Sequence, residues 1–192
     1  SEGEIIFTGV NGKRDFENGI PLLSSDIFEL ASISKQFTAM MIMICKEKGL
    51  LSYDDLVEKY LDIPYKGITI RNLLTHTSGL PDYQKIMDEN WDKSKVAGNL
   101  EIIEYLNKYH TQILFPPGEE YKYSNTGYVL LGSIVEKVTG KDFVEMSKKW
   151  IFEPLGMENT LIRSNEEKKI WKLCTEFQKI FHIIINCINK QN

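Results

Sequence analysis

A serine and a lysine three residues apart, Ser32 and Lys35, could together support nucleophilic chemistry. On a helix, positions i and i+3 share one face about 5–6 Å apart at Cβ, so the amine can reach the hydroxyl. A lysine that is buried, or that lies near other cations, loses its proton more readily and can serve as a base. The dipole and free N–H groups at a helix start suit a serine oxygen that becomes negatively charged. The pair is therefore a candidate nucleophile and base.

The spacing alone carries no weight, because this composition gives about one such Ser/Lys pair by chance. The alternative is a serine that caps a helix and a lysine that points into solvent. Context favours chemistry, since Lys35 precedes an apolar stretch, Ala39 to Cys45, which places its amine at the edge of a core.

A second candidate is Tyr123-Ser124-Asn125, which lies in an expected loop entering a helix, where site residues often lie. A phenol near such a lysine can carry protons, and an amide can hold both the lysine and a substrate carbonyl. A capping asparagine beside a packed tyrosine is the alternative. The similar Tyr105-Leu-Asn107 is expected within a helix, where positions i and i+2 face apart, so we discard it.

Composition bounds the class of protein. The 192 residues suit one domain, or one domain and a small part of another. The 42% hydrophobic and 26% charged fractions are ordinary for a globular protein. A net charge of −4 provides no basic field for nucleic acid. Three cysteines and three histidines are too widely spaced to indicate a disulfide framework or a metal site. The apolar stretch at 180–188 is too short to cross a bilayer.

The elements that must position these residues are mainly helical. We expect a strand at 4–10, a loop at 13–31, and a helix from Ser32 or Ser34 to Gly49 that is buried on every face in its middle. Ser52 and Asp55 resemble a capping box that opens a helix to about Asp62. Further helices are expected after a cap at Thr69, within 82–98, at 99–110, after a cap at Asn125, and at about 141–151. This pattern leaves a purely helical protein open.

Four longer blocks carry a resemblance to a known family. They are FELASISKQFTAMMIMICKEKGLLSYDDLVEKYL, ITIRNLLTHTSGLPDY, FPPGEEYKYSNTGYVLLGSIVEKVTGKDF and IFEPLGMENT. In order and content they resemble class C-like serine β-lactamases and the related penicillin-binding DD-peptidases and esterases, over roughly residues 4–162. The resemblance implies an α+β fold, here mostly a helical subdomain on an incomplete antiparallel sheet.

The resemblance also implies roles for single residues. Ser32 is the acylated nucleophile, Lys35 its proton acceptor, Tyr123 the second acid/base group, and Asn125 binds substrate and steadies Lys35. His76 to Gly79 are expected to form a structural turn, with His76 a satisfied histidine rather than a base. The implied substrates are β-lactams, D-Ala-D-Ala peptides or small esters, handled outside the cytoplasm and without a metal or cofactor.

The sequence departs from the family after Thr160, where its third element, a Lys-Thr-Gly or His-x-Gly strand, is missing. We therefore expect a chain truncated at both ends, with a partial hydrolase domain at 1–164 and a divergent tail at 165–192. The tail should form a helix at 165–181 and a strand at 182–188. The alternative to an active hydrolase is an impaired fragment that acts as an interaction module, with homo-oligomers formed through its uncovered surface. A Ser-His-Asp hydrolase is disfavoured, because the chain has no Gly-x-Ser-x-Gly turn.

Overall fold

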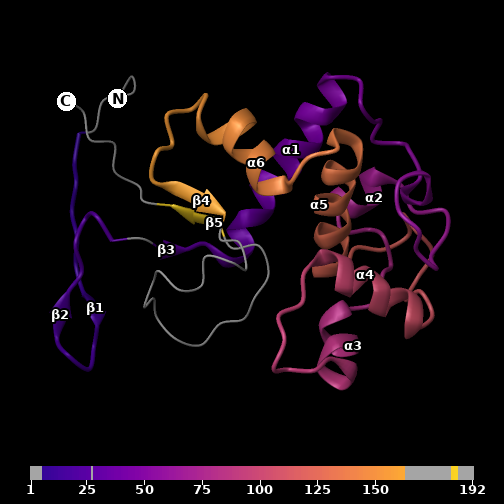
Figure 1. The fold of residues 1–192 in the computed structure, drawn as a ribbon, viewed down its shortest axis with the longest axis horizontal. Helices are drawn as coiled ribbons and strands as arrows, with labels where there is room; N and C mark the ends of the chain where they lie inside the picture. The colour runs from indigo at the N-terminus through magenta and orange to yellow at the C-terminus, as the bar shows by residue number, and fades with distance from the viewer. Residues whose placement is uncertain (1–5, 27, 163–182, 186–192) are drawn as a thin grey trace.

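The computed structural model describes residues 6–26, 28–162 and 183–185, and it shows a helical body beside a small sheet (Figure 1). The helices are α1 (Lys35–Glu47), α2 (Ile70–Leu74), α3 (Tyr83–Asn90), α4 (Asn99–Lys108), α5 (Asn125–Thr139) and α6 (Phe143–Ser147). Single turns of other helix types are η1 (Ala31–Ser34), η2 (Val57–Lys59) and η3 (Lys148–Phe152). The strands are β1 (Lys13–Asp15), β2 (Ile20–Pro21), β3 (Phe28–Glu29), β4 (Thr160–Ile162) and β5 (Ile183–Ile185). The α+β class expected from the sequence is confirmed.

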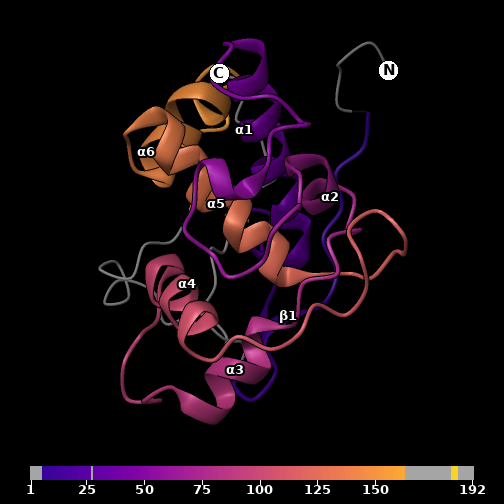
Figure 2. The ribbon, with the colours of Figure 1, turned by 90° about the vertical axis from the view of Figure 1, so that its right-hand side faces the viewer.

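Helix α5 forms the centre of the helical body, as both Figure 1 and Figure 2 show. Helices α1, α2 and α4 all pack against it. Leu130, Leu131 and Ile134 of α5 are fully buried, as are Met41 and Ile42 of α1. Burying side chains of this size stabilises a fold by about 1.5–3 kcal/mol each, so the contact between α1 and α5 is a main source of stability.

The strands form two small antiparallel units. Strand β1 pairs with β2, and the order of the second sheet is β3-β5-β4, with Phe28 opposite Ile185 and Thr160 also opposite Ile185. Strand β5 lies within the strand expected at 182–188. The helix expected at 165–181, and the boundary expected between a domain and a tail at 164, lie outside the described residues.

The expected strand at 4–10 is wrong over its described part, because residues 6–10 are not in a strand. Ile6 and Phe7 are 82% and 85% exposed, so no described element covers them. The first strand, β1, instead begins at Lys13 and returns as β2 through a turn at Asn18 and Gly19. The loop expected at 13–31 therefore contains a hairpin.

The helix expected from Ser52 to Asp62 is also wrong. The Asp55 carboxylate accepts hydrogen bonds from the Ser52 backbone N–H at 2.7 Å and from the Tyr60 hydroxyl at 2.5 Å. Leu56 forms an antiparallel bridge with Thr69, so this backbone pairs with a neighbouring segment and makes only the single turn η2. Local bonds of this kind compete with helix formation.

Helix α1 covers nearly the range expected for it, but only one of its faces is buried. Met41, Ile42 and Cys45 are buried, whereas Met40 and Met43 are 45% and 47% exposed. The expectation of burial on every face is therefore wrong, because the described residues cover α1 from one side only.

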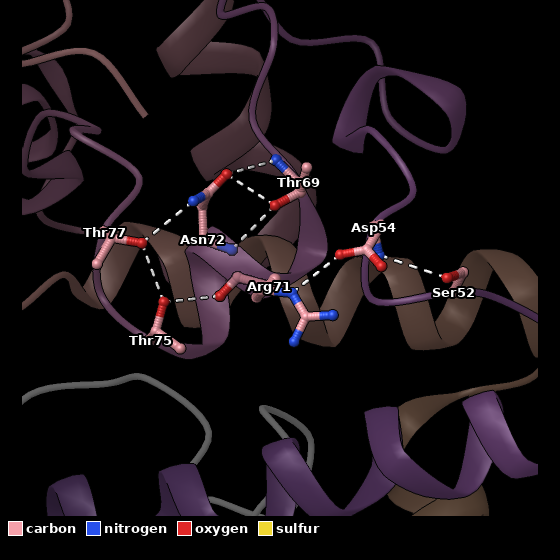
Figure 3. Close-up of polar contacts among 7 residues, drawn as sticks. All are labelled: Ser52, Asp54, Thr69, Arg71, Asn72, Thr75 and Thr77. Atoms are coloured by element: carbon pink, nitrogen blue, oxygen red, sulfur yellow. Dashed lines mark hydrogen bonds and ion pairs between the residues drawn. The ribbon is translucent and has the colours of Figure 1, made fainter. Parts of the chain in front are cut away.

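Helix α2 is held by a dense set of polar contacts (Figure 3). The Thr69 hydroxyl accepts from the Asn72 N–H, while the Asn72 amide oxygen accepts from the Thr69 N–H, which forms the expected cap. The Asn72 amide nitrogen then donates to the Thr77 hydroxyl at 3.2 Å, and Thr75 lies 3.0 Å from the same hydroxyl. These bonds fix the turn that contains residue 76.

Among the described residues, no helix combines the length and the apolar character that crossing a bilayer requires.

Candidate active site

The first candidate pair lies at the head of α1. Ser32 is exposed within η1, and Lys35 begins α1 and is half-buried. The Lys35 amine donates to the Ser32 hydroxyl at a distance of 3.5 Å, which is long for a hydrogen bond. The amine is therefore also able to approach a second partner. Ala31, directly before the serine, has φ of 46°, a conformation that non-glycine residues rarely adopt. The i, i+3 spacing thus brings the amine and hydroxyl together, although the turn between them is 3-10 rather than α.

The second partner of Lys35 is Asn125, which reaches it from the start of α5. Its side-chain oxygen accepts from the Lys35 amine at 2.7 Å. Asn125 is able to do this because Ser124 is the residue that caps α5, accepting from the Gly127 N–H at 3.1 Å. The expectation that Asn125 caps this helix is therefore wrong by one residue. The Asn125 amide therefore fixes the position of the amine through a hydrogen bond and carries no charge of its own.

Tyr123 completes the cluster from the loop before α5. Its hydroxyl donates to the Ser32 hydroxyl oxygen at 2.7 Å, and its ring centroid lies 4.8 Å from the Lys35 amine. Partial burial raises the pKa of Tyr123, but the proximity of Lys35 and Ser32 outweighs burial, so its pKa lies below the ordinary tyrosine value. The structure thus gathers all four residues that the sequence singled out.

Tyr128 is a member of this cluster that the sequence reasoning missed. Its ring centroid lies 5.5 Å from the Lys35 amine, and its hydroxyl donates to the Leu74 carbonyl at 3.1 Å. Burial raises the pKa of Tyr128. The signal was available, because Tyr128 follows Asn125 by three residues and so shares its helix face.

His76 lies behind the tyrosines, in the turn that follows α2. Its Nδ1 accepts from the Ser124 backbone N–H at 3.1 Å. The centroid of its ring lies 4.7 Å from the ring centroid of Tyr123 and 5.1 Å from that of Tyr128. Burial, and then the charge of Lys35, lower the pKa of His76, so the neutral ring is favoured. This is the satisfied histidine in a turn that the sequence led us to expect.

No group of three or more His, Cys, Asp or Glu side chains that could hold a metal ion occurs in the described part of the chain.

Comparison with known proteins gives a family for this arrangement. A family model described as "Beta-lactamase" matches residues 1–172. Penicillin-binding protein 4* of Bacillus subtilis (strain 168) is 44% identical over 161 residues, which are 83% of this chain and 36% of that protein. The chain thus spans about a third of the length of this curated relative.

Solved structures agree with this result. The octameric penicillin-binding protein homologue from Pyrococcus abyssi is 37% identical with a TM-score of 0.71, over 88% of this chain and 39% of that one. The D-amino acid amidase from Ochrobactrum anthropi SV3, in complex with L-phenylalanine, is 33% identical with a TM-score of 0.69, over 79% of this chain and 42% of that one. The sequence match and the shared fold together show that the chain belongs to the β-lactamase family, among the penicillin-binding proteins and serine β-lactamases.

Proposed function

We propose that this chain carries the acylation site of a serine hydrolase, in which Ser32 forms an ester with the acyl group of the substrate. The observation that supports this most directly is the position of the Ser32 hydroxyl, 2.7 Å from the Tyr123 hydroxyl and 3.5 Å from the Lys35 amine. A nucleophile within reach of a base that a third group holds in place is the usual signature of covalent catalysis. Here Asn125 is that third group.

In the proposed reaction, the Ser32 hydroxyl proton passes to whichever neighbour has lost its own: Tyr123 as a phenolate or Lys35 as a free amine. The serine oxygen bonds to the substrate carbonyl carbon, and the oxyanion lies close to the start of the helix. The bond to the leaving nitrogen or oxygen then breaks, and that atom takes the proton back from the same group. Water, activated by Tyr123, hydrolyses the ester and frees Ser32.

The substrate class we propose is a β-lactam, a peptide ending in D-Ala-D-Ala, or a small ester. The kinship with penicillin-binding proteins favours the first two, and the similarity to a D-amino acid amidase favours amides next to a D-configured centre. All of these present a carbonyl carbon with a nitrogen or oxygen leaving group, which is the chemistry the cluster suits. The site needs no metal or cofactor for these steps.

The test is covalent labelling followed by intact-mass measurement. The chain is incubated with benzylpenicillin or a fluorophosphonate probe, and peptide mapping locates the adduct. We expect one adduct on Ser32, lost in Ser32→Ala and retained in Ser94→Ala, a surface serine far along the sequence. Labelling of Ser32→Ala at the parent's rate would refute the proposal. A penicillin adduct that disappears with time would add evidence for hydrolysis.

A second function, self-association through α1, is favoured by its uncovered face. Ile33, Met40 and Met43 are 58%, 45% and 47% exposed along one side of this segment. Apolar side chains gathered in this way commonly mark an interface. The Pyrococcus abyssi homologue is described as octameric, which supports an assembly of copies. Light scattering should then give a multiple of 22.2 kDa that falls in a Met40→Gln, Met43→Gln double variant, and a monomer at every concentration would contradict the idea.

A further inference from the structure

The turn at residues 76–79 is joined to the loop that carries Tyr123 by a short ladder of backbone bonds. Lys122 N–H donates to the His76 carbonyl, Gly118 N–H to the Thr77 carbonyl, and Leu114 N–H to the Gly79 carbonyl, each at 2.8 Å. The polar contacts of Figure 3 hold the start of the same turn through Thr77. The position of residue 76 is therefore set by its surroundings before its side chain is considered.

The His76 side chain adds a contact at the centre of the candidate site. Its Nδ1 accepts from the backbone N–H of Ser124, the residue between Tyr123 and Asn125. Its ring also lies against the Tyr123 ring, at 4.7 Å between centroids. One side chain thus holds the backbone between two site residues and the ring of one of them.

We propose that His76, as a neutral ring, is a positioning residue that holds Tyr123 and Asn125 against Ser32 and Lys35, and that protonation of its Nδ1 releases this hold. The inference rests on the proposed function and deepens it, because it adds a residue that acts through others and a pH range in which the site is assembled.

The chemical reason lies in the lone pair of Nδ1. A neutral imidazole with its proton on Nε2 accepts the Ser124 N–H, whereas an imidazolium has N–H groups at both ring positions and accepts nothing. Protonation would therefore set two N–H groups against each other in a partly buried place. The bond would break and the loop between Tyr123 and Asn125 would lose its anchor.

The charges around the ring act in the same direction. The titratable and charged groups that face it are Lys35 from α1, Tyr121 and Tyr123 from the loop, and Tyr128 from α5. A second positive charge beside the Lys35 ammonium is unfavourable. Burial and Lys35 together place the pKa of His76 below its ordinary value of 6.5, so the neutral ring predominates at neutral pH.

The backbone at residue 76 suggests a matched pair of variants. Its φ is +59°, a conformation that asparagine, like histidine, adopts more readily than most non-glycine residues. The asparagine side-chain oxygen branches from the same carbon as Nδ1, so His76→Asn keeps an acceptor near that position but cannot be protonated. His76→Phe keeps a ring against Tyr123 and has no acceptor.

The experiment measures the rate of Ser32 labelling by a fluorophosphonate probe against pH for the parent and both variants. We expect the parent to lose rate as pH falls through the His76 pKa, below 6.5. Ser32 in His76→Phe should be labelled about 10²-fold more slowly at neutral pH, the effect that a displacement of reacting groups by about 1 Å can have. His76→Asn should stay within about tenfold of the parent and lack that acid loss. Equal rates for the parent and His76→Phe, or the same acid loss in His76→Asn, would overturn the proposal.

A second measurement does not depend on labelling. Nuclear magnetic resonance of the parent should show an unprotonated Nδ1 on His76 at neutral pH and a Ser124 amide proton that moves as His76 titrates. A Ser124 amide that ignores this titration would overturn the inference even if Ser32 is labelled. A parent that is never labelled, but whose Ser124 amide follows His76, would refute the proposed function and leave the hydrogen-bond switch standing.

Discussion

Replacing Gly79 by alanine should destabilise the chain far more than the same change at Gly140. Both glycines have positive φ, 68° and 64°, so both substitutions incur the left-handed strain of about 1–2 kcal/mol. Both also lower the entropy of the unfolded chain, which offsets about 0.4–1 kcal/mol of that strain. These contributions are common to the two variants and cancel when they are compared.

The difference between them comes from space. A Cβ at Gly79 would lie 2.1 Å from the Phe115 carbonyl oxygen and 3.1 Å from Ile113, whereas a Cβ at Gly140 meets nothing within 4 Å. An ordinary contact between carbon and oxygen is about 3.3–3.6 Å, so one backbone segment must move by more than about 1 Å. Overpacking of this kind costs about 1–3 kcal/mol. We expect Gly79→Ala to be less stable than Gly140→Ala by that amount.

The assay is thermal unfolding followed by circular dichroism, with urea unfolding as a check. For a chain of this length, 1 kcal/mol corresponds to about 2–4 °C, so Gly79→Ala should melt about 2–12 °C below Gly140→Ala. Equal melting temperatures would show that residues 113–115 yield freely, and would refute the idea that the 76–79 turn is tightly held. Because this turn carries His76, Gly79→Ala should also slow the labelling of Ser32, while Gly140→Ala should not.

Two more predictions concern charge and buried polar groups. Lys35→Met should raise the pKa of Tyr123, because the amine that lowers this pKa is gone while burial still raises it. Ultraviolet titration, with Tyr123→Phe as the background, measures the change. Lys46→Met, away from the site, should leave the pKa of Tyr123 unchanged. Thr126→Val should lower the free energy of unfolding in urea by about 2–6 kcal/mol. The fully buried Thr126 hydroxyl accepts from the Tyr83 N–H and donates to the Pro81 carbonyl, and each of these two groups left unpaired costs about 1–3 kcal/mol. The control is Thr139→Val, because the Thr139 hydroxyl bonds only to backbone groups in the last turn of α5 and just after it. A loss of unfolding free energy in Thr139→Val near that of Thr126→Val would contradict this reasoning.

The parts of the fold with local signals were predictable from the sequence. Helix α4 follows from amphipathic spacing and the cap of α2 from Thr69, and both occur as expected. The glycine that ends α5, Gly140, adopts φ of +64° as a helix terminator should. Such features depend on residues within one or two turns of each other.

The parts decided by distant contacts were not predictable. Ser124 and Asn125 are adjacent and both suit a helix cap, and the contact that occupies Asn125 comes from Lys35, 90 residues away. Strand β3 is two residues long and pairs with β5 near the other end of the chain, so it has no period to detect. Met43 is exposed because it lies on the side of α1 that the described residues leave uncovered. The apolar composition of the helix would be the same if every side were covered, so it does not predict this exposure.

The candidate site is a product of the packing between α1 and α5. Ser32 and Lys35 come with α1, while Tyr123 and Asn125 come with the start of α5, and 90 or 91 residues separate the bonded partners. Hydrogen bonds of this length tolerate shifts of only a few tenths of an ångström, so their geometry depends on the buried contact between the two helices. Helix α5 also packs against α2 and α4, and His76, in the turn after α2, accepts a hydrogen bond from the backbone of the residue that caps α5. The core that stabilises this chain therefore also sets the distances from Ser32 and Lys35 to Tyr123 and Asn125.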